Sequence, residues 1–580
     1  MAGPFDRFDV YEYDVLVIGA AGAGLRAAIE VAHQGSRVGV VCKSLLGKAH
    51  TVMAEGGCAA AMGNVDPQDG WTTHFMDTMK GGKFLNNWRM AQLHAQECPD
   101  RVRELERWGA VFDRTPDGKI SQRAFGGHTY RRLCHVGDRT GLELIRSLQD
   151  KAVHTDGLTV HMECTITKLF TDAEGRICGA FGYWRESGKF VVFKTHAIVL
   201  ATGGIGKAFR VTSGSWEYTG DGQILAYDAG AELLDMEFIQ FHPTGMVWPP
   251  GVQGILVTEA VRGEGGLLTN SEGERFMKNV DPERMELSTR DIVAKAIYRE
   301  VKAGRGSPNG GVFLDISHRG ADYIKMKLPS MYHQFKELAD VDITKGPMEV
   351  GPTCHYFMGG VKVEAESQMT NVPGLFAAGE VASGLHGANR LGGNSLGDLL
   401  VFGRRAGLGA LDYLQNTPAR SELTEQMIND AEADMLGPMQ RSEGECPYAI
   451  HKDLNKTMES GVGIVREADG LKTAIEELKT LKARAANVKV EGSRVFNPGW
   501  HLARDLHNLI TVSEGVARCA LQREESRGGH TRLDHEGYDD YWSTVNSIVK
   551  KAKDGTMEVG TQPLPQMPDE LKQLFEAEKK

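Results

Sequence analysis

Five side chains from the middle of the sequence could together bind a substrate with two negative charges. They are two histidines, two arginines and a threonine: His242, Thr258, Arg290, His355 and Arg390. Taken singly, each histidine is better explained as a structural residue that caps or packs. Taken together, the five suit a dicarboxylate, because arginine binds a carboxylate through two parallel hydrogen bonds while histidine and threonine add single ones. Beside a redox cofactor, such a site would remove or add hydride at a carbon next to a carboxylate.

A nucleotide-binding fold is the element that must position these side chains. The apolar run 13–18 is typical of a buried parallel strand, the stretch 19–24 (GAAGAG) opens a helix, and 36–42 forms the next strand. In this context a tight turn, backbone amides and a helix N-terminus face a pyrophosphate. The predicted cofactor-binding residues of this turn are Gly19, Gly22, Gly24 and Ala21, which stands in place of the usual middle glycine.

The ends of two strands refine the choice of dinucleotide. The second strand ends in Lys43 and Ser44 and not in the aspartate or glutamate that binds a ribose 2′-hydroxyl, which argues against NAD. By itself, Lys43 could be a solvated charge at a strand end. A later apolar strand, 197–201, runs into a turn at Thr202 and Gly203, as strands of flavoproteins do.

Length and composition exclude several classes of function. The chain has 580 residues, too many for one core, so roughly three or four domains are expected. A net charge of −11 gives no support for binding a nucleic acid, and basic pairs such as Arg131 and Arg132 are expected to be surface charges. The nine cysteines show no CxxC spacing, which argues against a metal or iron–sulfur site in this chain. Neither a secretory signal nor an apolar run of about 18 residues, the length of a spanning helix, is visible.

The stretch 48–57 (KAHTVMAEGG) carries a more specific signal. It places His50 on a short loop after the second strand, beside Gly56 and Gly57. The pattern resembles the flavin-attachment loop of the flavoprotein subunits of succinate dehydrogenase and fumarate reductase. In that family the imidazole is bonded covalently to a methyl carbon of the FAD ring. The resemblance extends from residue 13 to about residue 538 and therefore implies covalent FAD on His50.

The resemblance also implies roles for the residues of the substrate site. His242, Thr258, His355 and Arg390 would hold the dicarboxylate, and Phe125 would line its cavity. Clamping both carboxylates would align the substrate with the flavin and so use binding energy for orientation.

Proton transfer is assigned by the same resemblance to a second group. Arg290 would exchange the proton at the carbon opposite the hydride, and Glu259 and Arg262 would relay that proton to solvent. An arginine has an unperturbed pKa above about 12, so it can act in this way only if a carboxylate such as Glu259 returns its proton quickly. Glu259 and Arg262 are three residues apart and would share one face of a helix.

The remaining implied contacts are to FAD. Asp221 could by itself be only a helix N-cap, but the family places it at the cofactor. The residues expected to contact FAD, besides the glycine turn and His50, are Lys43, Ser44, Thr51, Gly56, Gly57, Thr202, Gly203, Asp221, Glu380, Ser395 and Leu396.

The predicted fold class is α/β, with a Rossmann-like FAD-binding domain that is split by an inserted α+β capping domain and followed by a helical bundle domain. The FAD-binding pattern covers 9–240 and resumes over 354–420, whereas 241–353 is predicted to form the cap. Helical spacing prevails over 421–530, and 531–580 is expected to be a C-terminal tail. A substrate would lie in the cleft between the cap and the FAD domain.

Electrons must leave a chain that has no cluster ligands and no membrane span. If the acceptor is a quinone, other chains must supply an iron–sulfur subunit and a membrane anchor. The resemblance therefore implies succinate and fumarate as substrates and a peripheral location, at the cytoplasmic face of the cell membrane in bacteria.

Alternatives remain open at this point. An L-aspartate oxidase shares the fold and the dicarboxylate site but lacks the attachment histidine, so His50 discriminates. A soluble NADH-linked fumarate reductase would need an additional electron-input module, and a binding scaffold would not need so many charges in one cleft.

One residue, Glu55, bears on the physiological direction. Glu55 occupies a position where fumarate reductases tend to carry glutamate and succinate dehydrogenases glutamine. A carboxylate there should disfavour the reduced anionic flavin. Succinate oxidation is nevertheless the commoner role, and we interpret the chain as a dehydrogenase, with fumarate reductase as the alternative.

Overall fold

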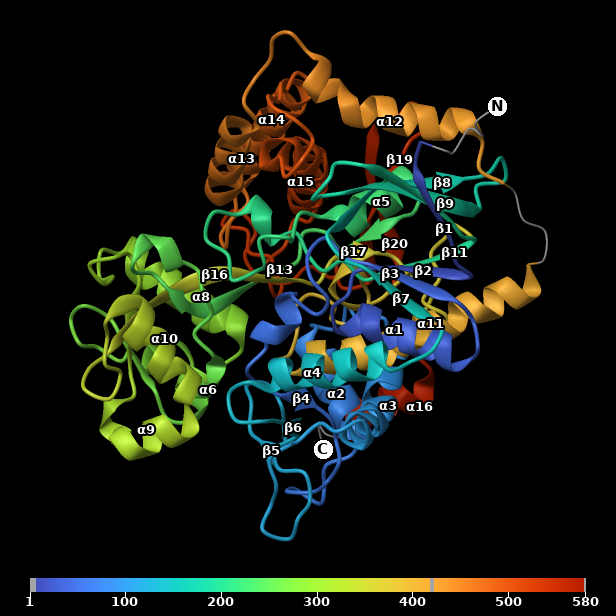
Figure 1. Ribbon diagram of the computed structural model, residues 1–580. Coiled ribbons are helices and arrows are strands. Elements are labelled where there is room, and N and C mark those ends of the chain that lie inside the picture. The colour runs from blue at the N-terminus through green and yellow to red at the C-terminus, as the bar shows by residue number, and fades with distance from the viewer. Residues whose placement is uncertain (1–6, 418–421, 578–580) are drawn as a thin grey trace.

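A five-stranded parallel sheet forms the centre of the molecule. The computed structural model describes residues 7–417 and 422–577, and Figure 1 shows their arrangement. The strand order is β18-β11-β2-β3-β7, and every neighbouring pair is parallel. The strands are β2 (Val15–Ile18), β3 (Val38–Val41), β7 (Leu158–His161), β11 (Ala197–Leu200) and β18 (Leu375–Ala377). The three middle strands are wholly buried, as expected of a parallel sheet between other layers.

Two long helices pack together beneath this sheet. Helix α1 (Gly22–His33) follows β2, and helix α11 (Asn394–Asn416) crosses it closely (Figure 1). A Cβ atom on Gly403 would lie 2.6 Å from the carbonyl oxygen of Ala23. Only glycine lets the two backbones come this near, so the pattern of small residues in α11 fixes the position of its N-terminus.

Further strands and helices surround the central sheet. A second sheet has the order β1-β10-β9-β8, and a small one the order β4-β6-β5. The strands are β1 (Asp9–Glu12), β8 (Cys164–Thr171), β9 (Ile177–Trp184), β10 (Phe190–Lys194), β4 (Cys58–Ala59), β5 (Gln122–Arg123) and β6 (Leu133–Cys134), and the neighbouring helices are α2 (Trp71–Gly81), α3 (Trp88–Arg107), α4 (Thr140–Val153) and α5 (Asp221–Asp228).

One arginine in this region corrects a sequence-based expectation. Arg131 is exposed and pairs with Asp66, but Arg132 is completely buried. Its guanidinium lies 2.8 Å from a carboxylate oxygen of Asp69 and 2.9 Å from one of Asp77. Both partners come from an earlier stretch of the chain, so no local pattern distinguishes the two adjacent arginines.

The segment between the two parts of the nucleotide-binding fold forms a separate lobe with its own hydrophobic core. Its sheet has the order β13-β16-β15-β14. The strands are β13 (Ile239–Met246), β14 (Leu267–Thr269), β15 (Val312–Asp315) and β16 (Met348–Phe357), and the helices include α6 (Glu259–Gly263), α7 (Met277–Val280), α8 (Arg290–Lys302), α9 (Ala321–Lys327) and α10 (Pro329–Ala339). Strands β13 and β16 run from the central body into the lobe at the left of Figure 1 and carry site residues at that junction.

The C-terminal part begins with four helices, α12 (Glu425–Gln440), α13 (Pro447–Gly461), α14 (Ala468–Ala485) and α15 (Pro498–Gln522). Helix α15 is buried along most of its length and reaches into the nucleotide-binding body. No helix in the described part of the chain is long and apolar enough to cross a membrane.

The stretch 531–580 is not the simple tail that its polar composition suggests. Strands β19 (Val545–Lys551) and β20 (Met557–Pro563) form a hairpin, and helix α16 (Asp569–Ala577) follows it. Strand β19 pairs with β12 (Leu233–Leu234), which pairs in turn with β17 (Gly360–Val361). The expectation failed because these partner strands lie far earlier in the chain, and the local sequence of the tail carries no signal of pairing with them.

Candidate functional site

One continuous cavity lies between the carboxyl ends of the central strands and the lobe built on β13 and β16. It brings together most of the residues singled out from the sequence. Those that line it are Gly19, Ala21, Lys43, Ser44, His50, Thr51, Gly56, Gly57, Phe125, Thr202, Gly203, Asp221, His242, Thr258, Glu259, Arg290, His355, Glu380, Arg390, Ser395 and Leu396. The exceptions are Gly22, Gly24 and Arg262, which lie behind the lining.

The turn between β2 and α1 explains the first two exceptions. A Cβ atom on Gly24 would lie 1.8 Å from the carbonyl oxygen of Gly19, so Gly24 serves the packing of α1 against the turn. Gly22 packs in the same way against Leu399. Gly19 has a φ of +112°, which favours glycine. Ala21, at the N-cap, provides no side-chain cap, so the first amides of α1 are left to face the cavity.

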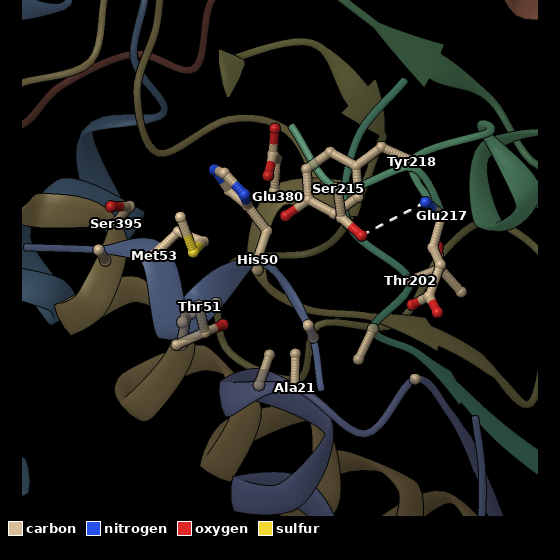
Figure 2. A pocket seen from close by; sticks show the side chains of 18 of the residues that line it. Ala21, His50, Thr51, Met53, Thr202, Ser215, Glu217, Tyr218, Glu380 and Ser395 are labelled. Atoms are coloured by element: carbon tan, nitrogen blue, oxygen red, sulfur yellow. Dashed lines mark hydrogen bonds between the residues drawn. The ribbon is translucent and has the colours of Figure 1, made fainter. Parts of the chain in front are cut away.

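His50 begins a short 3₁₀ turn (His50–Met53) on the wall of the cavity. Figure 2 shows its side chain pointing toward those of Tyr218 and Glu380. The His50 ring lies 5.2 Å from the Tyr218 ring and 5.9 Å from the His355 ring, centroid to centroid. Burial, with the nearby charge of Arg390, lowers the pKa of His50 to about 4. The imidazole is therefore neutral near pH 7 and keeps a nitrogen lone pair.

Lys43 is not the solvated charge that its place at a strand end allows. Its ammonium lies 3.0 Å from a carboxylate oxygen of Asp221 and 2.7 Å from one of Asp505. Burial disfavours the ammonium, but these two carboxylates outweigh burial and raise the pKa of Lys43 above its ordinary value. Because Asp505 belongs to α15, the helical part of the chain helps to hold a side chain of the cavity wall in place.

Gln240 joins the two arginines of the site, and no sequence motif marks it. Its side-chain carbonyl accepts a hydrogen bond from Arg290 at 3.1 Å and another from Arg390 at 2.9 Å. Its amide group donates to the Arg390 carbonyl at 2.7 Å, which fixes the orientation of the glutamine. Burial, with the nearby charge of Arg290, lowers the pKa of Arg390 to about 9. The one signal in the sequence was a polar residue two positions before His242.

Glu259 lies on α6, whose N-cap is Thr258, and it forms an ion pair with Arg290. One of its carboxylate oxygens lies 2.9 Å from Nε of Arg290 and 3.5 Å from a guanidinium nitrogen of Arg262. Burial favours the neutral acid, but the two guanidinium groups outweigh it and lower the pKa of Glu259. Arg262 is buried behind Glu259 and donates to the carbonyl of Glu286 at 2.6 Å. The predicted helical spacing of Glu259 and Arg262 is confirmed.

The two site histidines are each held by one ring nitrogen. Nδ1 of His242 lies 2.9 Å from the Thr244 carbonyl oxygen, and Nδ1 of His355 lies 2.7 Å from the Ser213 hydroxyl oxygen. Their rings are 5.2 Å apart. Burial, with the charge of Arg290, lowers the pKa of both histidines well below the ordinary value. Ser213 lies in an irregular loop, and sequence reasoning did not find it.

Phe125 closes one side of this region. The guanidinium carbon of Arg290 lies 6.0 Å from the centre of its ring. A Cβ atom on Gly392 would lie 2.3 Å from the same ring, and one on Gly56 would lie 2.6 Å from it. These two glycines therefore leave the space that the phenylalanine occupies.

Several polar atoms of the cavity are buried and have no hydrogen-bond partner within the described part of the chain. They include Nδ1 of His50, Nε2 of His242, Nε of Arg390 and Oε2 of Glu55. Such atoms are costly unless a ligand satisfies them. Together with the uncapped helix N-terminus at Ala21, they fit a cavity that is completed by a dinucleotide and an anionic substrate.

Comparisons with known proteins agree with this geometry. Residues 14–396 match the model of an FAD binding domain, and residues 451–573 match that of the fumarate reductase flavoprotein C-terminal region. The chain is 47% identical to a subunit of the fumarate reductase (CoM/CoB) of Methanothermobacter marburgensis, over 91% of this chain and 95% of that one. It is 40% identical to the succinate dehydrogenase flavoprotein subunit of Coxiella burnetii, over 92% and 93% of the two chains. A solved structure of Mycobacterium smegmatis Sdh1 in complex with UQ1 has a TM-score of 0.88 and 59% identity, with 97% of this chain and 95% of that chain covered.

Proposed function

We propose that this chain, which belongs to the family of FAD-dependent flavoprotein subunits of succinate dehydrogenases and fumarate reductases, oxidises succinate to fumarate in the cavity described above. The observation that carries the proposal is the pair of guanidinium groups joined by Gln240. Arg290 and Arg390 stand on either side of one carbonyl oxygen, within 3.1 Å and 2.9 Å of it. One carboxylate, Glu259, pairs with both Arg290 and Arg262, so the buried positive charge of Arg390 beside them calls for an anionic ligand.

Substrate binding is assigned to Arg390, His242, His355 and Thr258, with Phe125 as the wall. Both histidines are fixed at Nδ1, but by different partners. Nδ1 of His242 faces the Thr244 carbonyl oxygen, which can only accept, so this nitrogen carries the hydrogen and Nε2 is left as an acceptor. His355 can present Nε2–H to a carboxylate oxygen if its Nδ1 accepts a hydrogen bond. For His355 that bond would come from the Ser213 hydroxyl. A substrate with one carboxylate would leave part of this donor set unsatisfied, which favours a dicarboxylate.

Proton transfer is assigned to Arg290. In succinate oxidation the guanidinium would give one of its own protons to Glu259 and take one from the substrate carbon, and in fumarate reduction it would give a proton to the substrate carbon and take one back from Glu259. The Glu259 carboxylate, 2.9 Å from its Nε, would exchange that proton, and Arg262 would be the next carrier. The lowered pKa of Glu259 suits this role, because a carboxylate that stays ionised can receive a proton transiently.

The remaining predicted residues that line the cavity are assigned to binding the cofactor. The N-terminus of α1 would face the pyrophosphate, while Lys43, Ser44, Thr202, Gly203, Asp221, Glu380, Ser395 and Leu396 would surround the rest of FAD. Bound FAD would supply the two-electron acceptor beside the substrate carbon. His50, neutral and with a free Nδ1, would be its covalent tether, and this residue separates the proposal from an L-aspartate oxidase.

The direction of the reaction depends on the state of Glu55. Burial, with the charge of Asp138, raises the pKa of Glu55 well above its ordinary value. This favours the neutral acid, so the carboxylate expected from the sequence is the disfavoured form. A neutral Glu55 resembles the glutamine that succinate dehydrogenases carry, and this supports succinate oxidation. Fumarate reduction is the second candidate, because a relative at 47% identity is named a fumarate reductase.

Electron transfer out of the chain requires partners. We assign this role to an iron–sulfur subunit and to membrane anchor subunits, with the complex at the cytoplasmic face of the cell membrane and a quinone as the final acceptor. The similarity to Mycobacterium smegmatis Sdh1, which was solved in complex with UQ1, supports a quinone acceptor.

The test is a comparison of rates on the intact complex. Succinate oxidation with a quinone analogue and fumarate reduction with a low-potential donor should be measured on the same preparation. A succinate oxidation rate that equals or exceeds the fumarate reduction rate is expected. A fumarate reduction rate far above it would assign the chain to the reductases.

A further inference from the structure

A second concave site lies on the far side of α15 from the FAD cavity. It is enclosed by α12, by the C-terminal end of α14, by α15 and by strand β8. Its floor is apolar and is lined by Ala431, Met435, Pro438, Trp500, Ala503 and Ile510, of which Pro438 and Ala503 are half-buried and the other four are buried. Its remaining lining includes four lysines and arginines, so the cleft combines an apolar surface with positive charge.

Two arginines in this cleft are oriented without being neutralised. Arg441 donates to the Val488 carbonyl at 2.7 Å, and Arg504 donates to the Thr167 carbonyl at 2.7 Å. Each bond uses one of the five N–H groups of a guanidinium. No carboxylate forms an ion pair with either arginine in the part of the chain that the structure describes. Both side chains are partly exposed, and their remaining donors are available to a ligand.

The other charged groups of the lining do not cancel this excess. Four lysines and arginines, Lys168, Arg441, Lys482 and Arg504, face two aspartates, Asp228 and Asp434. Asp228 is already paired with Lys551 at 2.7 Å and with His507 at 3.3 Å, while Lys482 lies 3.4 Å from Glu514. A positive cleft is unexpected on a chain whose net charge is −11, and it concentrates anions locally.

We propose that this cleft binds a nucleoside diphosphate, with the phosphates on Arg441 and Arg504 and the base on the apolar floor. Guanidinium groups match phosphate oxygens through paired hydrogen bonds. A monocarboxylate carries one negative charge, which is too little to pair with Arg441, Arg504 and Lys168 together. Inorganic phosphate would leave the apolar floor uncovered. A ligand with a flat apolar body and at least two negative charges matches both parts of the lining.

The cleft and the FAD cavity share one turn of α15. Arg504 faces the cleft, and the next residue, Asp505, holds Lys43 in the wall of the FAD cavity at 2.7 Å. Because a nucleotide could also enter an empty FAD cavity, the two sites are distinguished only in flavin-loaded protein. The proposal is independent of the direction and substrate of the redox reaction.

The experiment is an equilibrium titration of the flavin-loaded protein with the fluorescent probe mant-ADP, followed by competition with unlabelled ADP and with pyrophosphate. Saturable binding is expected, with ADP competing more strongly than pyrophosphate because only ADP covers the floor. Arg441→Gln and Arg504→Gln should each weaken binding about tenfold or more, as expected for loss of a charged hydrogen-bonding partner. Arg518→Gln is the matched control, since Arg518 lies on the same helix but pairs with Glu514 outside the lining.

Three results would overturn the proposal. One is the absence of saturable binding at millimolar probe in protein whose flavin absorbance is normal. Another is binding that survives both arginine substitutions, which would place the nucleotide elsewhere. The third is competition by pyrophosphate equal to that by ADP, which would show that the base does not contribute to binding at this site.

Discussion

The hydroxyl oxygen of Ser213 lies 2.7 Å from Nδ1 of His355, on the wall of the substrate end of the cavity. Ser213 belongs to a loop that also pairs with the cap strand, because its amide donates to the Cys354 carbonyl at 2.9 Å. If the serine hydroxyl donates to Nδ1, the imidazole carries its hydrogen on Nε2 and can donate to a substrate carboxylate. The same hydroxyl also lies 3.4 Å from the Cys354 carbonyl oxygen, so the tautomer of His355 depends on which of the two atoms the serine donates to.

Replacing this serine should weaken substrate binding more than turnover. In Ser213→Ala the KM for succinate should rise about fivefold, which corresponds to the loss of one neutral hydrogen bond of about 1 kcal/mol. The kcat should change less than twofold, since the proton-transfer group is untouched. Steady-state kinetics across pH 6–9 would test this, with Ser213→Thr as the control that keeps the hydroxyl. An unchanged KM in Ser213→Ala would show that His355 does not depend on this bond.

The two arginines joined by Gln240 should differ in their kinetic roles. Arg390→Ala should raise the KM sharply and also lower kcat, because it removes both binding and alignment. Arg290→Ala should lower kcat at saturating succinate by roughly 10²–10⁴-fold, the range for loss of a general acid or base, while dicarboxylate inhibitors still bind. Arg290→Lys should retain a trace of activity with an altered pH profile. Near-normal kcat in Arg290→Ala would place proton transfer elsewhere.

Glu380 should make the stability of the chain depend on pH. Burial raises its pKa from 4.5 to about 7. Between these two values the folded chain holds a proton that the unfolded chain has lost, so stability must fall as pH rises through this window and then level off. The cost above pH 7 is about 3 kcal/mol, from 1.36 kcal/mol per pKa unit.

Glu380→Gln should remove this cost. Its free energy of unfolding, measured by urea titration of the purified chain, should exceed that of the wild type at pH 8, and the difference should vanish toward pH 4.5. A difference of the same size at both pH values would mean that the titration of Glu380 is not the cause.

The covalent link to FAD is predicted to depend on His50. Denatured wild-type protein should show flavin fluorescence at the mass of the chain on a gel, and His50→Ser should not. The variant should keep non-covalent FAD and lose more succinate oxidation than fumarate reduction, because the covalent bond raises the flavin potential. Release of all flavin from the wild type on acid precipitation would exclude the tether.

The sequence predicted the residues that lie in motifs of this site better than the residues that hold them in place through long-range hydrogen bonds and ion pairs. The glycine turn, His50 and the five substrate-site residues were predicted because each lies within a dense local pattern, and His50 and those five residues line one cavity. Gln240 and Ser213 were missed because their importance comes from partners 50 to 150 residues away. Asp505 was missed for the same reason, because it lies in a helix with the ordinary spacing of a bundle and its partner is the distant Lys43.

The fold shows the same limit. The nucleotide-binding strands and the helical region were predicted from hydrophobic spacing within single elements. Strand β19 was not, because its partner β12 lies more than 300 residues earlier. The buried Arg132 and the exposed Arg131 are neighbours in sequence, and only the distant Asp69 and Asp77 make them different.

The most direct test of the account is the anaerobic addition of succinate to the purified flavin-loaded chain, followed by flavin absorbance. Succinate should bleach the flavin band of the wild type, whereas butyrate, which has a single carboxylate, should not. In Arg290→Ala the band should shift on succinate binding without rapid bleaching. A wild-type flavin that succinate leaves oxidised, or that butyrate bleaches equally well, would contradict the assignment of this cavity to a dicarboxylate held by Arg290 and Arg390.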